Sequence, residues 1–443
     1  MKIQLSDHFT YKKLLKFTIP SIAMMIFTSI YGVVDGFFVS NFIGKVPFTA
    51  INLIFPFLMI VATVGFMLGT GGSAIVAKEF GEGKPDKANR HFSLFIYTAF
   101  VLGCVFAVFG FIFIRPISAL LGAKGEILEN CVIYARIQLV ALPFFVLQLM
   151  FQSFFVTAEK PQLGLAVTLA SGITNMVLDA LLIAVLPLGI AGASLATALS
   201  QVVGGLIPLI YFARRNSSIL KLGKCSFEVH ALLRASANGS SEFMSNISMS
   251  VVSILYNIQL IKYAGENGVA AYGVMMYVSF IFAAAFIGYS VGTAPIISYH
   301  YGAQNHGELK NLLKKSTTLI LISSVVMTII GVLVAKPLSI FFVGYDKELC
   351  DLTIRGFKIF ALSFLFMGTA IYSSGFFTAL NDGLTSALIS FLRTLVFQIA
   401  AVMILPLFFD IDGIWISIIV AEFMAFVLSA LFIIGKRNKY KYL

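Results

Sequence analysis

The chain has 443 residues, of which 59% are hydrophobic and only 12% are charged, and its mean hydropathy is +0.95. This composition excludes an ordinary soluble globular protein, in which about a quarter of the residues are charged. The net charge of +11 would suit nucleic acid, but the basic residues sit in loops between apolar segments. They form no basic stripe with interleaved aromatic residues, so we expect no nucleic-acid partner.

A helix needs about 20 apolar residues to cross a bilayer core of roughly 30 Å. The sequence contains twelve such runs, six in each half, which predicts an all-α integral membrane protein with twelve transmembrane helices. The runs lie near residues 14–40, 48–77, 92–115, 131–155, 162–186, 190–213, 236–260, 268–298, 316–335, 353–377, 385–406 and 412–435.

The loops differ in charge from one side of the predicted membrane to the other. Most of the 31 lysines and arginines lie in the N-terminal segment, the C-terminal segment and the loops on the same side as both. Short loops rich in lysine and arginine remain in the cytoplasm. The charge pattern therefore predicts a multi-pass protein of the cell membrane with both termini in the cytoplasm.

The second half of the sequence repeats the first at an offset close to 221 residues. Gly71 returns as Gly292 and Gly81 as Gly302, at the ends of apolar runs where glycines shape helix ends. Because each half has an even number of helices, both halves have the same orientation and form parallel repeats. We expect a six-helix lobe over residues 1–213, a cytoplasmic linker over 214–235 and a second lobe over 236–443. Paired bundles of this kind are typical of transporters that rock one lobe against the other.

Helix 1 combines a proline with a buried acid. Pro20 removes a backbone donor and should kink the helix, either as a moving part or as a static feature. Asp35 lies farther along the same helix, about 7 Å from its outer end at 1.5 Å per residue. A charged side chain within a bilayer costs roughly 2.5–3.5 kcal/mol on insertion scales, so each one requires a reason.

Helices 5 and 6 place further oxygen-bearing side chains at a similar depth. Asp179 and Thr197 each lie about 10 Å from the outer end, and Asn175 is one helical turn from Asp179 on the same face. With Asp35, these side chains predict a site for Na⁺, or for a proton shared by two carboxylates. The alternative is a polar network that only holds helices together. At offset 221 the second half has no acid at these positions, so we expect the coupling site in one lobe only.

Three charged residues in the second half are secondary candidates. Glu242 is near the cytoplasmic end of helix 7, where either a functional role or contact with water would explain it. Arg393 and Glu422 lie on successive helices about 7–8 Å apart in depth, a gap that a long arginine side chain can span. We expect a structural ion pair, with a substrate contact as the alternative.

Several short motifs accompany the predicted helices. These are LLKFTIPSI and VVDGFFVS in helix 1, GTGGSAIVAKEFGEGK at the end of helix 2, NMVLD in helix 5, GIAGASLATALSQ in helix 6, and the paired TAEKP and TALND segments. With these motifs, the twelve spans and the duplication, the chain resembles the multidrug and toxin extrusion (MATE) family of antiporters over essentially its whole length. The bacterial branch with DinF-like and MepA-like members looks closer.

The resemblance implies two six-helix lobes around a central cavity that opens alternately to each side of the membrane. It further implies export of organic cations or drugs in exchange for inward H⁺ or Na⁺. The family's cation site corresponds to Asp35, Asn175, Asp179 and Thr197 in this chain, and the kinking proline of helix 1 corresponds to Pro20. Glu242 lies too near the cytoplasm to match the acid that one branch uses in the second lobe.

Other function classes fit the sequence less well. A flippase for lipid-linked oligosaccharides, from the same superfamily, would need a cationic cavity for a pyrophosphate, whereas Arg393 is the clear intramembrane base. An enzyme would need a nucleophile–base pair or metal cluster within the spans, and the spans contain no cluster of histidine or cysteine. We therefore expect a monomeric transporter of lipophilic organic cations, not an enzyme. It needs no cofactor beyond the coupling H⁺ or Na⁺, and no metal apart from Na⁺ at the four-residue site.

Overall fold

The structure is a computed structural model that describes residues 3–442, and every regular element within this part is a helix. The first half of the chain forms six long helices, two of which end in a short π-helical segment. In order these are α1 (Tyr11–Phe38) with η1 (Val39–Ile43), α2 (Lys45–Gly81), α3 (Pro85–Leu120), α4 (Gly125–Thr157), α5 (Pro161–Asp179) with η2 (Ala180–Val185), and α6 (Gly189–Ala213).

The second half begins with a short helix at the end of the connection between the halves. The expected linker, residues 214–235, is helical from Val229 onward. These residues belong to α7, which Gly239 separates from the first long helix of the second half. The elements are α7 (Val229–Asn238), α8 (Ser240–Gly302), α9 (His306–Val343), α10 (Lys347–Phe360), η3 (Ala361–Ser363), α11 (Phe364–Ala379), α12 (Gly383–Phe391), η4 (Leu392–Phe397), α13 (Gln398–Ile404), α14 (Pro406–Gly435) and α15 (Arg437–Tyr440).

The number of membrane crossings follows from the lengths of these segments. Residues 3–442 contain 11 helical segments that are long and apolar enough to span a bilayer. One of them, α8, has 63 residues and would be about 95 Å long if it were straight, roughly three times the bilayer core. Its backbone is broken at Gly265, where φ is 61° and ψ is −151°, so α8 accounts for two crossings. This part of the chain therefore contains the twelve predicted crossings.

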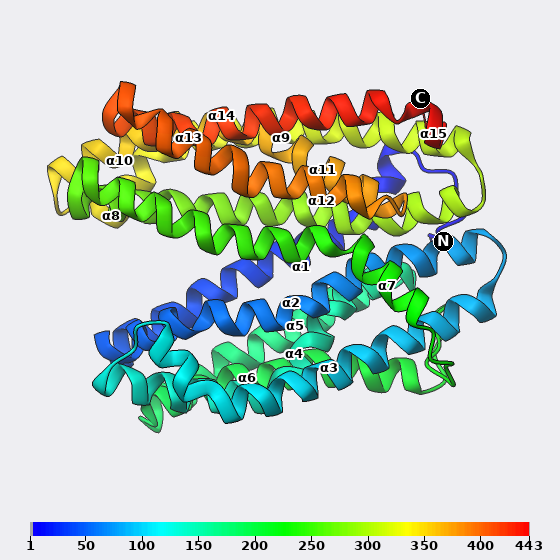
Figure 1. The fold of residues 1–443 in the computed structure, drawn as a ribbon, viewed down its shortest axis with the longest axis horizontal. Coiled ribbons are helices and arrows are strands. Elements are labelled where there is room, and N and C mark those ends of the chain that lie inside the picture. The colour runs from blue at the N-terminus through cyan, green and yellow to red at the C-terminus, as the bar shows by residue number, and fades with distance from the viewer. Residues whose placement is uncertain (1–2, 443) are drawn as a thin grey trace.

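The long helices form two groups (Figure 1). One group contains α2 to α6, the other contains α8 to α14, and α1 lies between them in contact with both α5 and α8. Each group encloses its own cluster of buried apolar side chains. The N- and C-termini lie at the same end of the molecule, which we call the terminal face.

The backbone of the two halves changes direction at matching places. Four pairs of residues with left-handed φ are separated by 221 or 222 residues. These pairs are Gly44 and Gly265, Gly83 and Gln304, Glu159 and Asn381, and Gly189 and Asp410. Three of the pairs contain a residue with a side chain, for which this conformation is uncommon. The recurrence supports the interpretation that the halves are structural repeats.

The two halves meet through glycine at the terminal face. A Cβ atom built on Gly81 of α2 would lie 2.0 Å from the carbonyl oxygen of Tyr299 on α8. In the matching position, a Cβ on Gly302 would lie 2.0 Å from the carbonyl oxygen of Lys78. Only residues without a side chain allow backbones to approach this closely. The glycines therefore hold α2 and α8 in direct contact and close the seam between the halves at this end.

We expect Gly81→Ala and Gly302→Ala to separate α2 from α8 at the terminal face. The added methyl group would meet rigid backbone, and overpacking of this kind costs about 1–3 kcal/mol. The thermal unfolding temperature of the purified protein should fall in both variants. Gly273→Ala is the matched control, because a Cβ atom there meets nothing within 4 Å. Equal unfolding temperatures for all three variants would contradict the proposed contact.

Candidate functional site

Both intramembrane aspartates of the first half lie where an α-helix changes into a π-helical segment. Asp35 is in the last turn of α1, immediately before η1, and Asp179 is the last residue of α5, immediately before η2. A π-helical turn leaves part of the normal hydrogen-bond ladder unmade and is frequent at functional sites. The sequence analysis did not predict these segments.

The structure brings the four predicted site residues together from three helices. Asp35 of α1 faces Asp179 and Asn175 of α5 and Thr197 of α6. The Nδ2 atom of Asn175 donates a hydrogen bond of 3.4 Å to Oγ1 of Thr197, whose own hydroxyl donates to the carbonyl oxygen of Ala193. Asp179 and Asn175 are 0% and 1% exposed, whereas Asp35 is partly exposed. The arrangement is an oxygen-rich cluster inside the first lobe.

Four oxygen atoms of this cluster have no hydrogen-bond partner within residues 3–442. They are Oδ1 of Asp35, Oδ1 of Asn175 and both carboxylate oxygens of Asp179. A buried polar group without a partner costs free energy, and a buried charge without a counter-charge costs more. The cluster therefore suits a ligand that brings positive charge, either a proton shared by the two carboxylates or a small metal cation.

Two tyrosines complete the cluster and were missed by the sequence analysis. Tyr134 of α4 interacts with Asp35, Asp179 and Thr197 and is only 3% exposed, and Tyr31 of α1 lies close to Asp35. A tyrosine in an apolar helix does not stand out as a buried acid does. The sequence placed the start of this apolar run near residue 131, only three residues before Tyr134. In the structure α4 begins at Gly125, so Tyr134 lies nine residues from its start, about 14 Å along the helix axis.

The tyrosine side of the cluster is held by a buried polar link between α4 and α6. The hydroxyl of Ser194 donates a 2.7 Å hydrogen bond to the carbonyl oxygen of Tyr134. Gln138, one turn along α4, donates from Nε2 to the carbonyl oxygen of Ser194 at 2.9 Å. These bonds fix α4 and α6 together beside the two carboxylates.

The second half has a neutral hydrogen-bond network in the corresponding place. Tyr256 is the counterpart of Asp35 at offset 221, and its hydroxyl lies 2.8 Å from Oε1 of Gln398 and 2.8 Å from Oγ of Ser417. Gln398 begins α13, two residues before Ala400, which matches Asp179 at the offset of 221. Neutral groups that satisfy one another need no ion. The two lobes thus differ in chemistry at equivalent positions.

Arg393 and Glu422 form the ion pair that the sequence predicted. Arg393 lies on η4, and its Nε atom is 2.8 Å from Oε2 of Glu422, with a second contact of 2.9 Å between Nη2 and Oε1. The side chains are 16% and 3% exposed, so the pair is largely removed from solvent. The bidentate geometry is the strong form of an arginine–carboxylate contact and neutralises the arginine inside the second lobe.

The remaining candidates lie away from the carboxylate cluster. Glu242 is the third residue of α8 and follows Gly239, which packs against Met67 within α2, and the structure does not bring it to Asp35. Pro20 is buried within α1, which continues as a helix on both sides of it, and Ser21 and Ile22 directly after it pack against Gly288 of α8. The kink at Pro20 stays a prediction.

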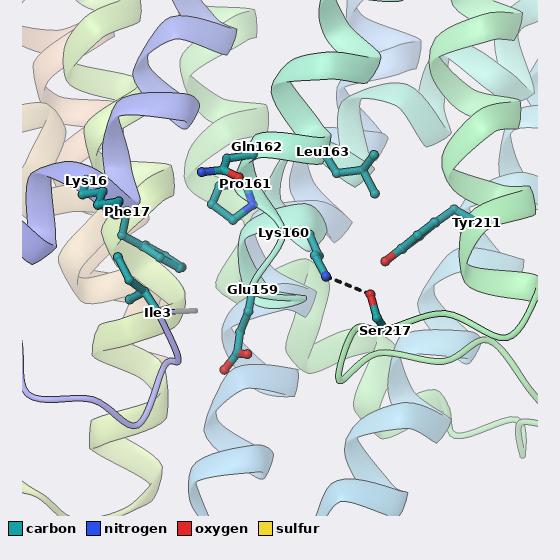
Figure 2. A pocket seen from close by; sticks show the side chains of 10 residues that line it. All are labelled: Ile3, Lys16, Phe17, Glu159, Lys160, Pro161, Gln162, Leu163, Tyr211 and Ser217. Atoms are coloured by element: carbon teal, nitrogen blue, oxygen red, sulfur yellow. Dashed lines mark hydrogen bonds between the residues drawn. The ribbon is translucent and has the colours of Figure 1, made fainter. Parts of the chain in front are cut away.

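At the terminal face the N-terminal segment connects the two halves. The backbone N–H of Leu5 donates to a carboxylate oxygen of Glu159 in the loop before α5, and that of Phe9 donates to Glu308 of α9, each at 2.9 Å. Leu5 and Phe9 are fully buried. A cavity of about 580 Å³ lies beside this segment. Among its lining residues, Figure 2 shows Ile3 and Phe17 on one side and Tyr211 on the other. This cavity is separate from the carboxylate cluster, because neither aspartate lines it.

Comparisons with known proteins agree with this architecture. A multidrug export protein MepA of Staphylococcus haemolyticus (strain JCSC1435) is 26% identical over 431 residues, covering 97% of this chain and 94% of that protein. A solved MATE structure in the straight conformation superposes with a TM-score of 0.93 at 21% identity. An outward-facing conformation of a multidrug resistance MATE family transporter of the MOP superfamily superposes with a TM-score of 0.92 at 21% identity. Both alignments cover 98% of each chain.

The fold is that of a multi-pass membrane transporter. The sequence profile of the MatE family matches residues 20–181 and again residues 243–404, which together make up most of the chain. The chain therefore belongs to the MatE family, the multidrug and toxin extrusion transporters. The two matched ranges also divide the chain in the same way as the repeated backbone turns.

The ion pair generates a prediction that separates a structural role from a substrate contact. Glu422→Gln should destabilise the protein by about 3–5 kcal/mol, because Arg393 would remain as an uncompensated buried charge. The double variant Arg393→Met, Glu422→Leu should recover most of this stability. We expect the double variant to transport normally, as measured by thermal unfolding and by substrate efflux in parallel. A stable double variant that has lost transport would contradict the structural role.

Proposed function

We propose that this protein is a multidrug efflux antiporter that exports lipophilic organic cations in exchange for inward H⁺ or Na⁺. The observation that carries the proposal is the group of four buried oxygens, two of them on Asp179, that have no hydrogen-bond partner within residues 3–442. Membership of the MatE family and the likeness to MepA multidrug export proteins support the same function. Small-molecule substrates follow from the class of these relatives.

We further propose that the terminal face is cytoplasmic and that the described state is closed there. The lysine-rich and arginine-rich segments lie on this side, as expected for cytoplasmic loops. The Gly81 and Gly302 contacts and the N-terminal segment join the two halves at this end. The likeness to an outward-facing transporter structure supports a state in which the site is reached from outside.

Coupling in this scheme requires that ion and substrate prefer different states of the transporter. A proton or Na⁺ binds between Asp35 and Asp179 and compensates their charge, which draws α1 and α5 together. Because α1 also contacts α8, a shift of α1 at the site is transmitted to the second lobe. Pro20 lies on α1 between the ion site and the terminal face, where a change of helix direction would link the shift of α1 at the site to movement at the terminal face.

The identity of the ion depends on how the cluster is filled. Two carboxylates, the Asn175 amide oxygen and the Thr197 hydroxyl together provide oxygen ligands of the kind that bind Na⁺. The same two carboxylates can instead share a proton, because like charges at close range favour protonation of one of them. We propose a monomer as the functional unit, since each chain contains both lobes and a complete cluster.

The flippase alternative is less well supported by the geometry. Transport of a lipid-linked pyrophosphate would need free positive charge inside the lobes. Arg393, the intramembrane base identified in the sequence, is held in a bidentate pair with Glu422 and is therefore neutralised. The orphaned groups in the first lobe are acceptors, and they would repel a pyrophosphate.

We expect Asp35→Asn and Asp179→Asn each to reduce gradient-driven export by at least about tenfold, within the range of typical coupling energies. The measurement is efflux of a fluorescent organic cation from proteoliposomes under separate imposed Na⁺ and pH gradients. Asp86→Asn is the matched control, because this aspartate is exposed at the start of α3, away from the cluster.

The efflux measurement identifies the coupling ion and also tests the site. Efflux driven by one gradient and lost in both cluster variants, but kept in Asp86→Asn, supports the antiporter and identifies its ion. Normal efflux in both cluster variants would remove the cluster from the mechanism. Wild-type protein that moves no organic cation under either gradient would contradict the proposed function.

A further inference from the structure

A second cavity at the terminal face has a different character from the first. It has a volume of about 630 Å³ and lies between the loop after α2 in the first half and the loop after α8 and the C-terminal residues of the second half. Four lysines line it, Lys78, Lys84, Lys439 and Lys441, against the single acid Glu82. We call it the lysine pocket.

The positive charge of the lysine pocket is only partly compensated. Lys84 and Lys78 share Glu82, at 2.8 Å and 3.7 Å. Burial raises the pKa of Glu82, but the hydrogen bond from Lys84 and the charges of the nearby lysines more than offset this and lower it below its usual value. Within residues 3–442, neither Lys439 nor Lys441 has a carboxylate at ion-pair distance.

Two of the four lysines lie against a pair of packed tyrosine rings. The rings of Tyr301 and Tyr440 pack edge to face with centroids 5.8 Å apart, and the ammonium groups of Lys78 and Lys439 lie 5.3 Å and 4.9 Å from these rings. Tyr440 is buried, and its hydroxyl donates a 2.8 Å hydrogen bond to Asp382. The packing and the hydrogen bond of Tyr440 therefore fix the backbone that carries Lys439 and Lys441, so the pocket does not depend on a free tail.

A histidine nitrogen at the pocket wall also lacks a hydrogen-bond partner among the described residues. The Nδ1 atom of His306, which lines the lysine pocket at the start of α9, is shielded from solvent and has no hydrogen-bond partner in the described part of the chain. When the ring carries a hydrogen on Nδ1, this atom can donate a hydrogen bond to a ligand oxygen.

We propose that the lysine pocket is a binding site for a phosphate-bearing anion, either the headgroup of an anionic phospholipid or a free phosphomonoester. Lysine ammonium groups bind phosphate as point charges, and basic pockets between helices at the cytoplasmic surface suit anionic headgroups. The carboxylate cluster needs positive charge, whereas this site needs negative charge, so the two sites take different ligands.

The pocket joins the two lobes across the seam. Lys78 and Lys84 belong to the first half, and Lys439 and Lys441 belong to the second. Gly302, which contacts the backbone of Lys78, is itself part of the pocket wall. An anion shared by both halves binds more tightly when the terminal face is closed, and therefore favours that state. The side of the membrane rests on the proposed topology, but binding of the anion does not require transport.

Binding is tested on purified full-length protein in detergent by titration with short-chain phosphatidylglycerol, short-chain phosphatidylcholine or glycerol phosphate. Wild-type protein should bind phosphatidylglycerol and not phosphatidylcholine. The double variant Lys439→Gln, Lys441→Gln should bind about 30-fold more weakly, because each lysine near an anionic surface contributes roughly fivefold. Lys221→Gln, Lys224→Gln is the matched control, since these exposed lysines lose the same charge and line neither cavity.

The arms of this titration distinguish the two sources of phosphate. Binding of glycerol phosphate with the same dependence on Lys439 and Lys441 supports the pocket and makes a soluble phosphomonoester its ligand. Binding of phosphatidylglycerol alone supports the pocket and makes a lipid its ligand. Equal binding of both lipids, or an equal loss in the control variant, overturns the proposal in favour of general surface attraction.

The preference for the closed state has its own readout. Spin labels at Asp86→Cys and Lys310→Cys, one in each half and both exposed, would report the separation of the halves in a background without the four native cysteines. Phosphatidylglycerol should shift the distances toward the shorter population, and the shift should be absent in Lys439→Gln, Lys441→Gln. An unchanged distribution in wild-type protein that binds the lipid would overturn the link between the pocket and closure.

Discussion

Two aspartates that lie side by side without a counter-charge from the described chain are the constraint on which the rest of the structure depends. Asp35 and Asp179 come from different helices, and both carboxylate oxygens of Asp179 lack a hydrogen-bond donor. A membrane protein tolerates such a pair only if a proton or cation neutralises it. In the proposed function, an ion gradient supplies the free energy for transport by filling and emptying this site.

The two lobes differ in the chemistry of their buried polar groups. In the first lobe Asp35 and Asp179 have carboxylate oxygens without hydrogen-bond partners in the described chain. In the second lobe Tyr256, Gln398 and Ser417 form hydrogen bonds with one another. The Arg393–Glu422 pair places one positive and one negative group in the second lobe, and their charges cancel. In the proposed mechanism, the second lobe is the stable partner against which the first lobe responds to an ion. The contacts of Gly81 and Gly302 hold α2 and α8 together at the terminal face, so the proposed movement of the lobes would separate them at the other end.

Much of the fold could be predicted because a bilayer imposes simple length and charge rules. The twelve crossings, the ion pair and the gathering of four side chains follow from run lengths and helix depth. Tyr134 was missed because an uncharged tyrosine does not stand out in an apolar run, and because the predicted start of this run, near residue 131, placed it close to the membrane surface. The π-helical segments after Asp35 and Asp179 and the lysine pocket depend on backbone geometry and on contacts between distant loops, which periodicity does not record.

The central claim is that the Asp35–Asp179 pair changes its proton or ion occupancy during transport. Infrared difference spectroscopy of the purified protein, recorded on addition of substrate at constant pH, observes the carboxyl groups directly. The account predicts a change in a carboxyl band in wild-type protein, either loss of a protonated carboxyl or a shift on release of Na⁺, that is absent in Asp179→Asn. The same band change in Asp179→Asn, or none in wild-type protein that binds substrate, would contradict it.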